Sequence, residues 1–123
     1  MKKLLGALLL GVSSPLWAQA EKPKWDVNTG GGAQLKDVKI DVTEGSWLDV
    51  DVSPDGRTIA FSLLGDIYLL PIGGGTATRI ADGLAWEVQP RFSPDGRRIA
   101  FTSDRGGGDN IWVMNADGSD QRQ

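Results

Sequence analysis

Three features of the sequence predict an all-β fold. Apolar and polar residues alternate, short apolar runs are rich in β-branched and aromatic residues, and a pattern of about 40 residues occurs twice. Alternation with a period of two is typical of half-buried strands, and no stretch after the first twenty residues keeps a helical period. We therefore expect antiparallel strands joined by tight turns from Val38 onward.

The first twenty residues predict a secretory signal peptide. Lys2 and Lys3 precede a short apolar run, Leu4 to Val12, and small residues stand at Ala18 and Ala20. This order matches a signal peptide cleaved after Ala20. The apolar run is shorter than the ~18–20 residues of a membrane span. We therefore expect a periplasmic or secreted protein with no membrane span after cleavage.

Composition excludes several kinds of chemistry. Removal of residues 1–20 takes away Lys2 and Lys3, which leaves 11 basic against 16 acidic residues and a charge of −5. Without a block of basic residues, no nucleic-acid partner is expected. The chain has no cysteine, hence no disulfide, and no histidine, the commonest general base near neutral pH. Ser-His-Asp, Cys-His and histidine–metal chemistry are impossible within these residues.

The strands follow one another at short intervals. Residues 21–36 hold a proline and three consecutive glycines without any period, and are predicted to be a linker. Beyond it, the segment 47–53 alternates, with Leu48, Val50 and Val52 on one side. Two units of four strands are expected: 38–42, 47–53, 57–62 and 66–71 in the first, and 76–80, 88–93, 97–102 and 110–114 in the second.

The sequence Ser-Pro-Asp-Gly occurs at 53–56 and again at 93–96. Proline presets the backbone for the second position of a type I turn, and glycine takes the left-handed position that follows. Each copy therefore predicts a hairpin between two strands. Further turns are expected at Gly73 and Asp117, which are 44 residues apart because the second unit has a longer loop at 103–110.

Four short strands that recur every 40–44 residues are the signature of a β-propeller blade. We expect two four-stranded antiparallel blades, at 37–75 and 76–120, with residues 121–123 opening a missing third blade. Propellers close with about four to eight blades, because one blade cannot bury both of its faces. The sequence therefore predicts a fragment of a larger propeller, whose remaining blades are partners of this chain.

The stretch "SPDGRRIAFTSDRGGGDNIWVMNADGSD", residues 93–120, resembles the repeat of TolB-like propellers, which also occurs in tricorn-like and prolyl-oligopeptidase-like proteins. The resemblance covers about 38–120 and implies the fold. It implies little about function, because this fold hosts many activities.

A narrower resemblance rests on "WDVN", "VKIDVTEGSWLDVDVSPDG", "LLGDIYLLPIGGGTATRI" and "LAWEVQPRFSPDG". These look like the N-terminal propeller of secreted proteins in which a metal-dependent amidohydrolase domain follows. The resemblance implies a scaffold or substrate filter, with the divalent metal held by a later catalytic domain. Two alternatives stay open: a non-enzymatic periplasmic protein-binding propeller of the TolB type, and the gating propeller of a serine peptidase.

Several motifs resemble parts of known binding sites. The Gly-Gly-Gly runs at 73–75 and 106–108 lack the glycine spacing of a dinucleotide loop and are predicted to be turns. Asp104, Asp109 and Asn110 offer oxygen ligands for calcium, but a solvated loop with Asp104 near Arg105 is favoured. We therefore assign no catalytic, cofactor-binding or metal-ligating residue to this chain, and expect no catalytic activity from it alone.

Three structural hypotheses concern the blade surfaces. Asp51 and Arg91 stand at equivalent places in the two units and are proposed to pair between blades, with a solvated face as the alternative. Pro90 lies within an expected strand, so the hydrogen-bond ladder should break or bulge there. Three of the five tryptophans, Trp47, Trp86 and Trp112, could stack a ligand, but packing between blades is favoured.

Overall fold

The computed structural model describes residues 26–123, so the predicted signal peptide lies outside the described residues. The described part begins with a short 3-10 helix, η1 (Val27–Gly32), inside the segment expected to be a linker. Asp26 caps this helix, because its carboxylate accepts a hydrogen bond of 2.9 Å from the backbone amide of Asn28.

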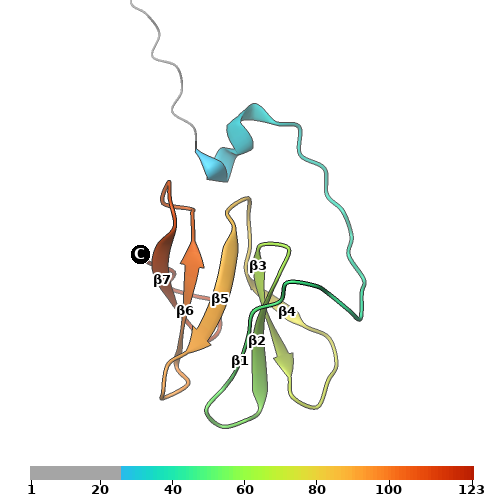
Figure 1. Ribbon diagram of the computed structural model, residues 1–123, viewed down its shortest axis with the longest axis vertical. Helices are drawn as coiled ribbons and strands as arrows, with labels where there is room; N and C mark the ends of the chain where they lie inside the picture. The colour runs from blue at the N-terminus through green and yellow to red at the C-terminus, as the bar shows by residue number, and fades with distance from the viewer. Residues whose placement is uncertain (1–25) are drawn as a thin grey trace, which may run out of the picture.

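Among residues 26–123, seven strands form two antiparallel sheets that lie side by side (Figure 1). Sheet 1 has the order β1-β2-β3-β4, and sheet 2 has the order β5-β6-β7. The predicted all-β fold class is confirmed. The bounds are β1 (Val50–Val52), β2 (Thr58–Leu63), β3 (Asp66–Pro71), β4 (Thr78–Ala81), β5 (Glu87–Phe92), β6 (Arg98–Ser103) and β7 (Asn110–Asn115).

Both Ser-Pro-Asp-Gly turns form as predicted. In the first turn the amide of Gly56 donates to the carbonyl of Ser53 over 2.8 Å, and Gly56 takes a left-handed φ of 72°. The second turn repeats this bond between Gly96 and Ser93, also at 2.8 Å. These turns join β1 to β2 and β5 to β6, so the same four residues set the start of each sheet.

The grouping of strands differs from the prediction. Residues 76–80 were expected to open the second unit, but β4 pairs with β3 and completes sheet 1. In sheet 2 the equivalent place is taken by Arg122, which forms an isolated bridge with Val113. Residues 121–123 therefore lie where the fourth strand of sheet 2 would begin, in contrast to the expected first strand of a third blade.

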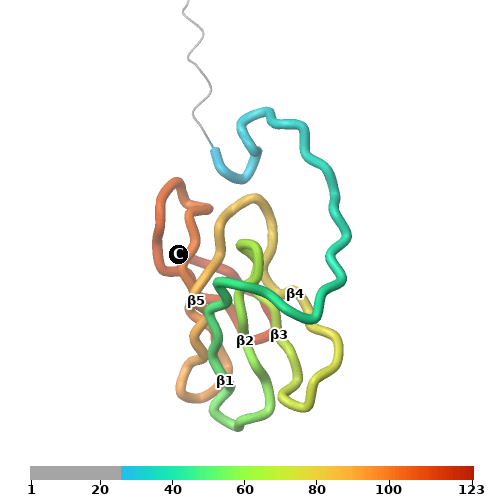
Figure 2. Tube along the Cα trace, turned by 45° about the vertical axis from the view of Figure 1, so that its right-hand side comes forward, coloured from blue at the N-terminus to red at the C-terminus, as the bar shows by residue number. Residues whose placement is uncertain are grey.

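The strand expected at 38–42 is not formed, and the chain from Ala33 to Asp49 contains no strand. By the repeat of 40 residues this segment corresponds to β4, and β4 pairs with the sheet that precedes it in the chain. No such preceding sheet is present among residues 26–123. Figure 2 shows this segment looping away from the two sheets before it enters β1.

The predicted disruption at Pro90 is confirmed. The pairing of β5 with β6 shifts register between Val88 and Arg91, and Gln89 inside this bulge has a φ of 57°. Proline offers no amide hydrogen to the ladder, so the strand accommodates it by bulging. Pro90 itself is fully buried.

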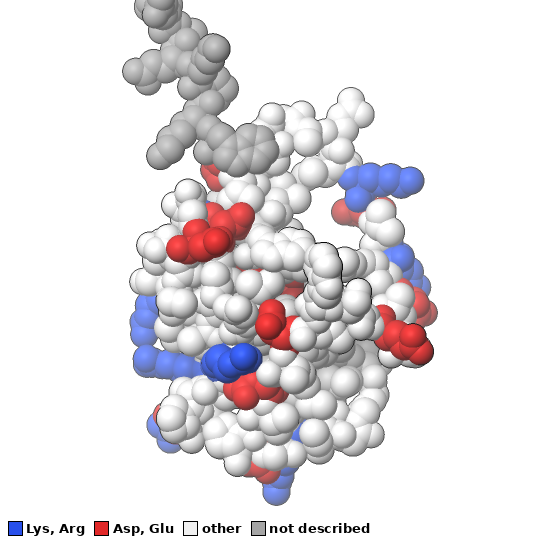
Figure 3. Space-filling model, in the orientation of Figure 1, with Lys and Arg blue, Asp and Glu red and all other residues white. Residues whose placement is uncertain are grey.

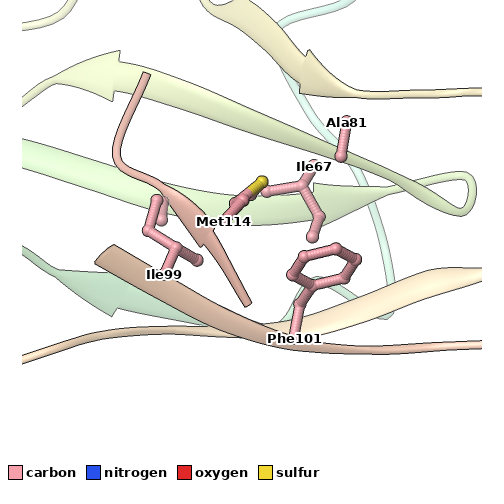
Figure 4. Close-up of a cluster of buried hydrophobic side chains, with 6 residues drawn as sticks. Ile67, Ala81, Ile99, Phe101 and Met114 are labelled. Carbon is pink, nitrogen blue, oxygen red and sulfur yellow. The ribbon is translucent and has the colours of Figure 1, made fainter. Parts of the chain in front are cut away.

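The hydrophobic core lies between the two sheets (Figure 4). Ile67 and Ala81 of sheet 1 point toward Ile99, Phe101 and Met114 of sheet 2, and all five are at most 3% exposed. Burial of apolar side chains stabilises this contact by about 25 cal/mol for each Å² removed from water. The two sheets therefore pack face to face, in the way that neighbouring propeller blades do.

The opposite faces of the two sheets carry exposed apolar side chains. Val50 and Val52 of β1 are 55% and 46% exposed, and Ile111 of β7 is 65% exposed. In the view of Figure 3, charged side chains are scattered, with broad uncharged areas between them. Within residues 26–123, no helix is long and apolar enough to cross a membrane.

Candidate functional site

The interface between the two sheets holds Asp51 and Arg91, the two residues expected to pair between blades. Asp51 of β1 accepts a hydrogen bond of 2.7 Å from the backbone amide of Phe92 on β5. Arg91 donates in the other direction, to the carbonyl of Val50 over 3.2 Å and to its own neighbour Pro90 over 2.8 Å. These two residues tie the first strands of the two sheets together.

The proposed Asp51–Arg91 ion pair is corrected by these contacts. Both side chains reach across to the other sheet, but each binds backbone atoms there. The ion pairs among the described residues do not include Asp51 with Arg91. The physical reason is that the first strand of each sheet is an edge strand, whose unpaired backbone groups compete for polar side chains.

A second polar contact, missed from the sequence, lies between Glu87 and Arg105. Glu87, at the start of β5, is fully buried, and its carboxylate forms an ion pair with the Arg105 guanidinium, which is 18% exposed. Among the described residues, no hydrogen bond to either carboxylate oxygen of Glu87 accompanies this ion pair. Burial lowers the pKa of Arg105, while the nearby carboxylate of Asp82 acts in the opposite direction.

Aromatic rings and an amide surround this buried charge. The Arg105 guanidinium lies 5.2 Å from the centre of the Trp112 ring and 5.9 Å from that of Phe101, within the range of cation–π attraction. It also donates to the side-chain oxygen of Gln121. The amide nitrogen of Gln121 in turn donates to the carbonyl of Ile80 on sheet 1 over 3.2 Å. Arg105 is thus the centre of a cluster that links both sheets.

A tight backbone approach lies beside this cluster. The amide of Glu87 donates to the carbonyl of Gly65 over 2.8 Å, and a Cβ atom at Gly65 would lie only 2.7 Å from the Trp86 ring. Trp86 is held in place by its amide, which donates to Asp104 over 2.8 Å. Glycine suits position 65, because at its φ of 87° a side chain would be strained and its Cβ would force the Trp86 indole to shift.

The three tryptophans have different environments. Trp112 packs against the core, and Trp86 covers Gly65 although it is 56% exposed. These two agree with the prediction of packing between blades. Trp47 is 96% exposed and packs against neither sheet. By the repeat, Trp47 occupies in the first unit the place that Glu87 occupies in the second.

At the opposite end of the sheets, the two Ser-Pro-Asp-Gly turns border an open hollow of about 550 Å³. The hydroxyl of Ser53 donates to Asp55, and that of Ser93 donates to Asp95, each over 2.6 Å. These hydroxyl donors, helped by backbone amides, lower the pKa of both carboxyl groups from the ordinary value of 3.8. Each carboxylate therefore stabilises its own turn through hydrogen bonds.

The oxygen groups of Asp104, Asp109 and Asn110, for which a solvated loop was favoured over a calcium site, do not converge. Asp104 accepts from the amide of Trp86, and Asn110 donates to the carbonyl of Gly108. Within the part of the chain that the structure describes, no three carboxylates, histidines or cysteines come together as metal ligands. Arg105, expected beside Asp104 in a solvated loop, pairs instead with Glu87. The glycine runs at 73–75 and 106–108 lie in turns, between β3 and β4 and between β6 and β7.

The described fold and interface define a pair of neighbouring β-propeller blades. Comparison with known protein families identifies the type of propeller. Residues 32–123 match the model of the TolB beta propeller domain. The chain therefore belongs to the TolB beta propeller domain family.

Relatives support this assignment. An uncharacterized protein of Agrobacterium fabrum is 34% identical over 96 residues, which are 75% of this chain and 31% of that protein. The Tol-Pal system protein TolB of Bordetella pertussis is 45% identical over 58 residues, 46% of this chain and 13% of TolB. A solved structure of a TolB candidate from Agrobacterium tumefaciens is 34% identical with a TM-score of 0.60, covering 66% of this chain and 31% of that one.

Proposed function

We propose that this chain supplies two adjacent blades to an exported TolB-type propeller, which serves as a scaffold or substrate filter. The observation that carries this proposal is the interface between the sheets, where Asp51 binds the amide of Phe92 and Glu87 pairs with Arg105. The hydrogen bond from the Phe92 amide to Asp51 holds the two sheets together, and the buried Glu87–Arg105 pair stiffens the structure beside it. Such rigidity suits a scaffold that presents its loops to another domain or protein.

The finer form of the proposal is that the full protein is a periplasmic metal-dependent amidohydrolase. It rests on the resemblance of the segments around 25–96 to propellers that precede such a domain. The matched part of this chain spans only 31% of one relative and 13% of another. The metal ligands and the catalytic groups belong, in this proposal, to a later domain, and the propeller restricts access to them.

The alternative is a non-enzymatic propeller that binds other proteins, as part of a Tol-Pal-type system. The similarity to a Tol-Pal system protein named TolB, at 45% identity, favours this alternative. Under it, the loops and turns at the ends of the sheets contact a protein partner. The gating propeller of a serine peptidase is a third candidate, which has no relative among those compared above to support it.

One experiment separates these forms. The natural gene product is purified from its source, its mass is measured, and amide hydrolysis is assayed with zinc or manganese before and after chelation. Turnover that chelation abolishes supports the amidohydrolase. Inactivity combined with capture of Tol-Pal system proteins supports the binding propeller. Turnover blocked by a serine-directed inhibitor and insensitive to chelation would favour the peptidase and contradict both.

Export is tested separately, on the chain expressed from its own start codon. We expect it in the periplasmic fraction, with Glu21 as the first residue by N-terminal sequencing. A cytoplasmic product that still begins at Met1 would contradict the exported scaffold, whatever the parent enzyme does.

A further inference from the structure

The chain contains four Asp-Gly pairs, and one of them differs from the other three in how its groups are held. Asp-Gly is the pair in which aspartate rearranges most readily, because glycine has no side chain to hinder attack by its amide nitrogen on the neighbouring carboxyl group. In a folded protein the reaction depends on how firmly these two groups are fixed. The pairs are Asp55-Gly56, Asp82-Gly83, Asp95-Gly96 and Asp117-Gly118.

The rearrangement needs only the chain itself and water. The glycine amide nitrogen attacks Cγ of the protonated aspartate, a C–N bond forms, and the amide proton leaves with the carboxyl hydroxyl as water. The product is a five-membered succinimide ring, which water then opens at either of its two carbonyls. Opening at the main-chain carbonyl gives isoaspartate, in which the backbone runs through the side chain and is one methylene longer.

The two Ser-Pro-Asp-Gly turns hold both reacting groups. The amide of Gly56 donates to the carbonyl of Ser53 over 2.8 Å, so it is fixed in the turn. The carboxylate of Asp55 accepts from the Ser53 hydroxyl over 2.6 Å and from the Arg57 amide over 3.1 Å. The turn at Asp95 repeats these three hydrogen bonds at the same distances.

The turn at Asp117 is held in the same way. The amide of Gly118 donates to the carbonyl of Asn115 over 2.9 Å, and Asp117 accepts from the hydroxyl and the amide of Ser119. At all three turns the serine hydroxyl, helped by a backbone amide, lowers the pKa of the aspartate. An ionised carboxylate has no hydroxyl to release as water, so these three pairs are protected from attack.

The pair Asp82-Gly83 lacks this protection. It lies in the bend between β4 and β5, outside a hydrogen-bonded turn. Among residues 26–123, no backbone hydrogen bond holds the Gly83 amide, and a Cβ atom built at Gly83 would meet nothing within 4 Å. The Asp82 carboxylate, 62% exposed, forms an ion pair of 3.2 Å with Arg79, whose side chain is 52% exposed. Ion pairs this open to water hold a side chain only weakly.

We propose that Asp82 is the site at which the folded chain forms isoaspartate, and that the other three Asp-Gly pairs react only when the chain unfolds. The fold thus selects one of four chemically similar pairs. The selection depends on the turn hydrogen bonds at the three protected pairs and on the open space around Gly83.

The position of Asp82 gives the reaction a structural consequence. Residues 82–86 form the connection from sheet 1 to sheet 2. This loop carries Trp86, which lies over Gly65, and leads directly into Glu87, which is buried in its ion pair. An added backbone methylene lengthens the loop and shifts both contacts. The rearranged chain should therefore have a weaker contact between its two sheets.

The test follows isoaspartate at each pair separately. Trypsin places the four pairs in four different peptides, because an arginine stands between each pair and the next. The purified chain is stored in mildly acidic buffer, folded or unfolded in urea, and then digested. Isoaspartate in each peptide is measured by mass spectrometry and by methyl transfer from S-adenosylmethionine with an isoaspartyl methyltransferase. In the folded chain most of it should be at Asp82, whereas in urea all four pairs should react at comparable rates.

Variants confirm the assignment. Asp82→Glu keeps the charge but would have to form a less favourable six-membered ring, so the signal of the folded chain should disappear. Asp117→Glu is the matched control and should leave that signal unchanged. Stored chain should also unfold at lower urea than fresh chain, and Asp82→Glu should prevent this loss.

Two results would overturn the proposal. One is isoaspartate spread evenly over the four peptides of the folded chain. The other is a folded chain without isoaspartate at Asp82 after the unfolded chain has reacted. Neither result bears on the exported scaffold role.

Discussion

The carboxylate of Asp51 on β1 accepts a hydrogen bond of 2.7 Å from the backbone amide of Phe92 on β5, 41 residues along the chain. Because Phe92 belongs to an edge strand, its amide would otherwise need water or another acceptor. The contact joins β1 and β5, the first strands of the two sheets. A single side chain therefore holds these two strands against each other.

Asp51→Ala is expected to lower the free energy of unfolding by about 1.5–3 kcal/mol, the usual worth of a hydrogen bond to a charged group. Urea unfolding at pH 7 measures the loss. Asp41→Ala, at an exposed position with no resolved bond, is the control and should have little effect. Exchange of the two charges, Asp51→Arg with Arg91→Asp, should not restore stability, since both side chains bind backbone atoms.

Arg105→Met is expected to destabilise the chain by about 3–5 kcal/mol, because it leaves the buried Glu87 carboxylate without a partner. Glu87→Leu combined with Arg105→Met should recover most of the loss, since both charges are then removed. Chemical denaturation of the single and double variants gives the comparison. A double variant as unstable as Arg105→Met would show that lost packing, not the unpaired charge, dominates.

Gly65→Ala should destabilise far more than Gly74→Ala. Both glycines have nearly the same left-handed φ, 87° and 88°, which costs an L-residue roughly 1–2 kcal/mol. Only at Gly65 would the added Cβ meet an atom, the Trp86 ring at 2.7 Å. Thermal unfolding of the two variants isolates the contact from the backbone cost. Equal losses would mean that the indole moves aside freely.

Acid should weaken the Ser-Pro-Asp-Gly turns. The pKa values of Asp55 and Asp95 are lowered in the folded chain by the hydroxyls of Ser53 and Ser93. A lowered folded pKa means that the stabilisation is present above the unfolded value of 3.8 and is lost as pH falls through the folded value. Unfolding measured from pH 6 to pH 2 should show this decline. Asp55→Asn with Asp95→Asn should flatten the curve, and an unchanged slope would contradict the assignment.

Much of the fold could be predicted because it depends on short stretches of sequence. The two Ser-Pro-Asp-Gly turns, the strands that flank them and the bulge at Pro90 each depend on the backbone preferences of a few neighbouring residues. The grouping of β4 with sheet 1 could not be read in this way. A strand of four residues carries no local sign of which neighbour it will pair with, and the repeat has the same period wherever its boundary is drawn.

The candidate site was less predictable, because its contacts are long-range. Glu87 and Arg105 are 18 residues apart, and the sequence around neither residue points to the other as its partner. The only sign was a glutamate among apolar residues at the start of a strand, which suggests a buried charge in need of a partner. Asp51 and Arg91 were correctly placed at the interface by the repeat. The partners predicted for them were wrong, because a sequence pattern shows which side chains are present but not which backbone groups of an edge strand are left unpaired.

The central claim is that the two repeat units are neighbouring blades packed face to face. Methyl nuclear Overhauser effects in the isotopically labelled chain test it most directly. We predict cross-peaks from Ile67 of β3 to the Phe101 ring and to the Met114 methyl, which belong to one buried cluster. Cross-peaks confined to residues within each sheet, with none between Ile67 and either residue, would show that the sheets do not pack together and would contradict the account.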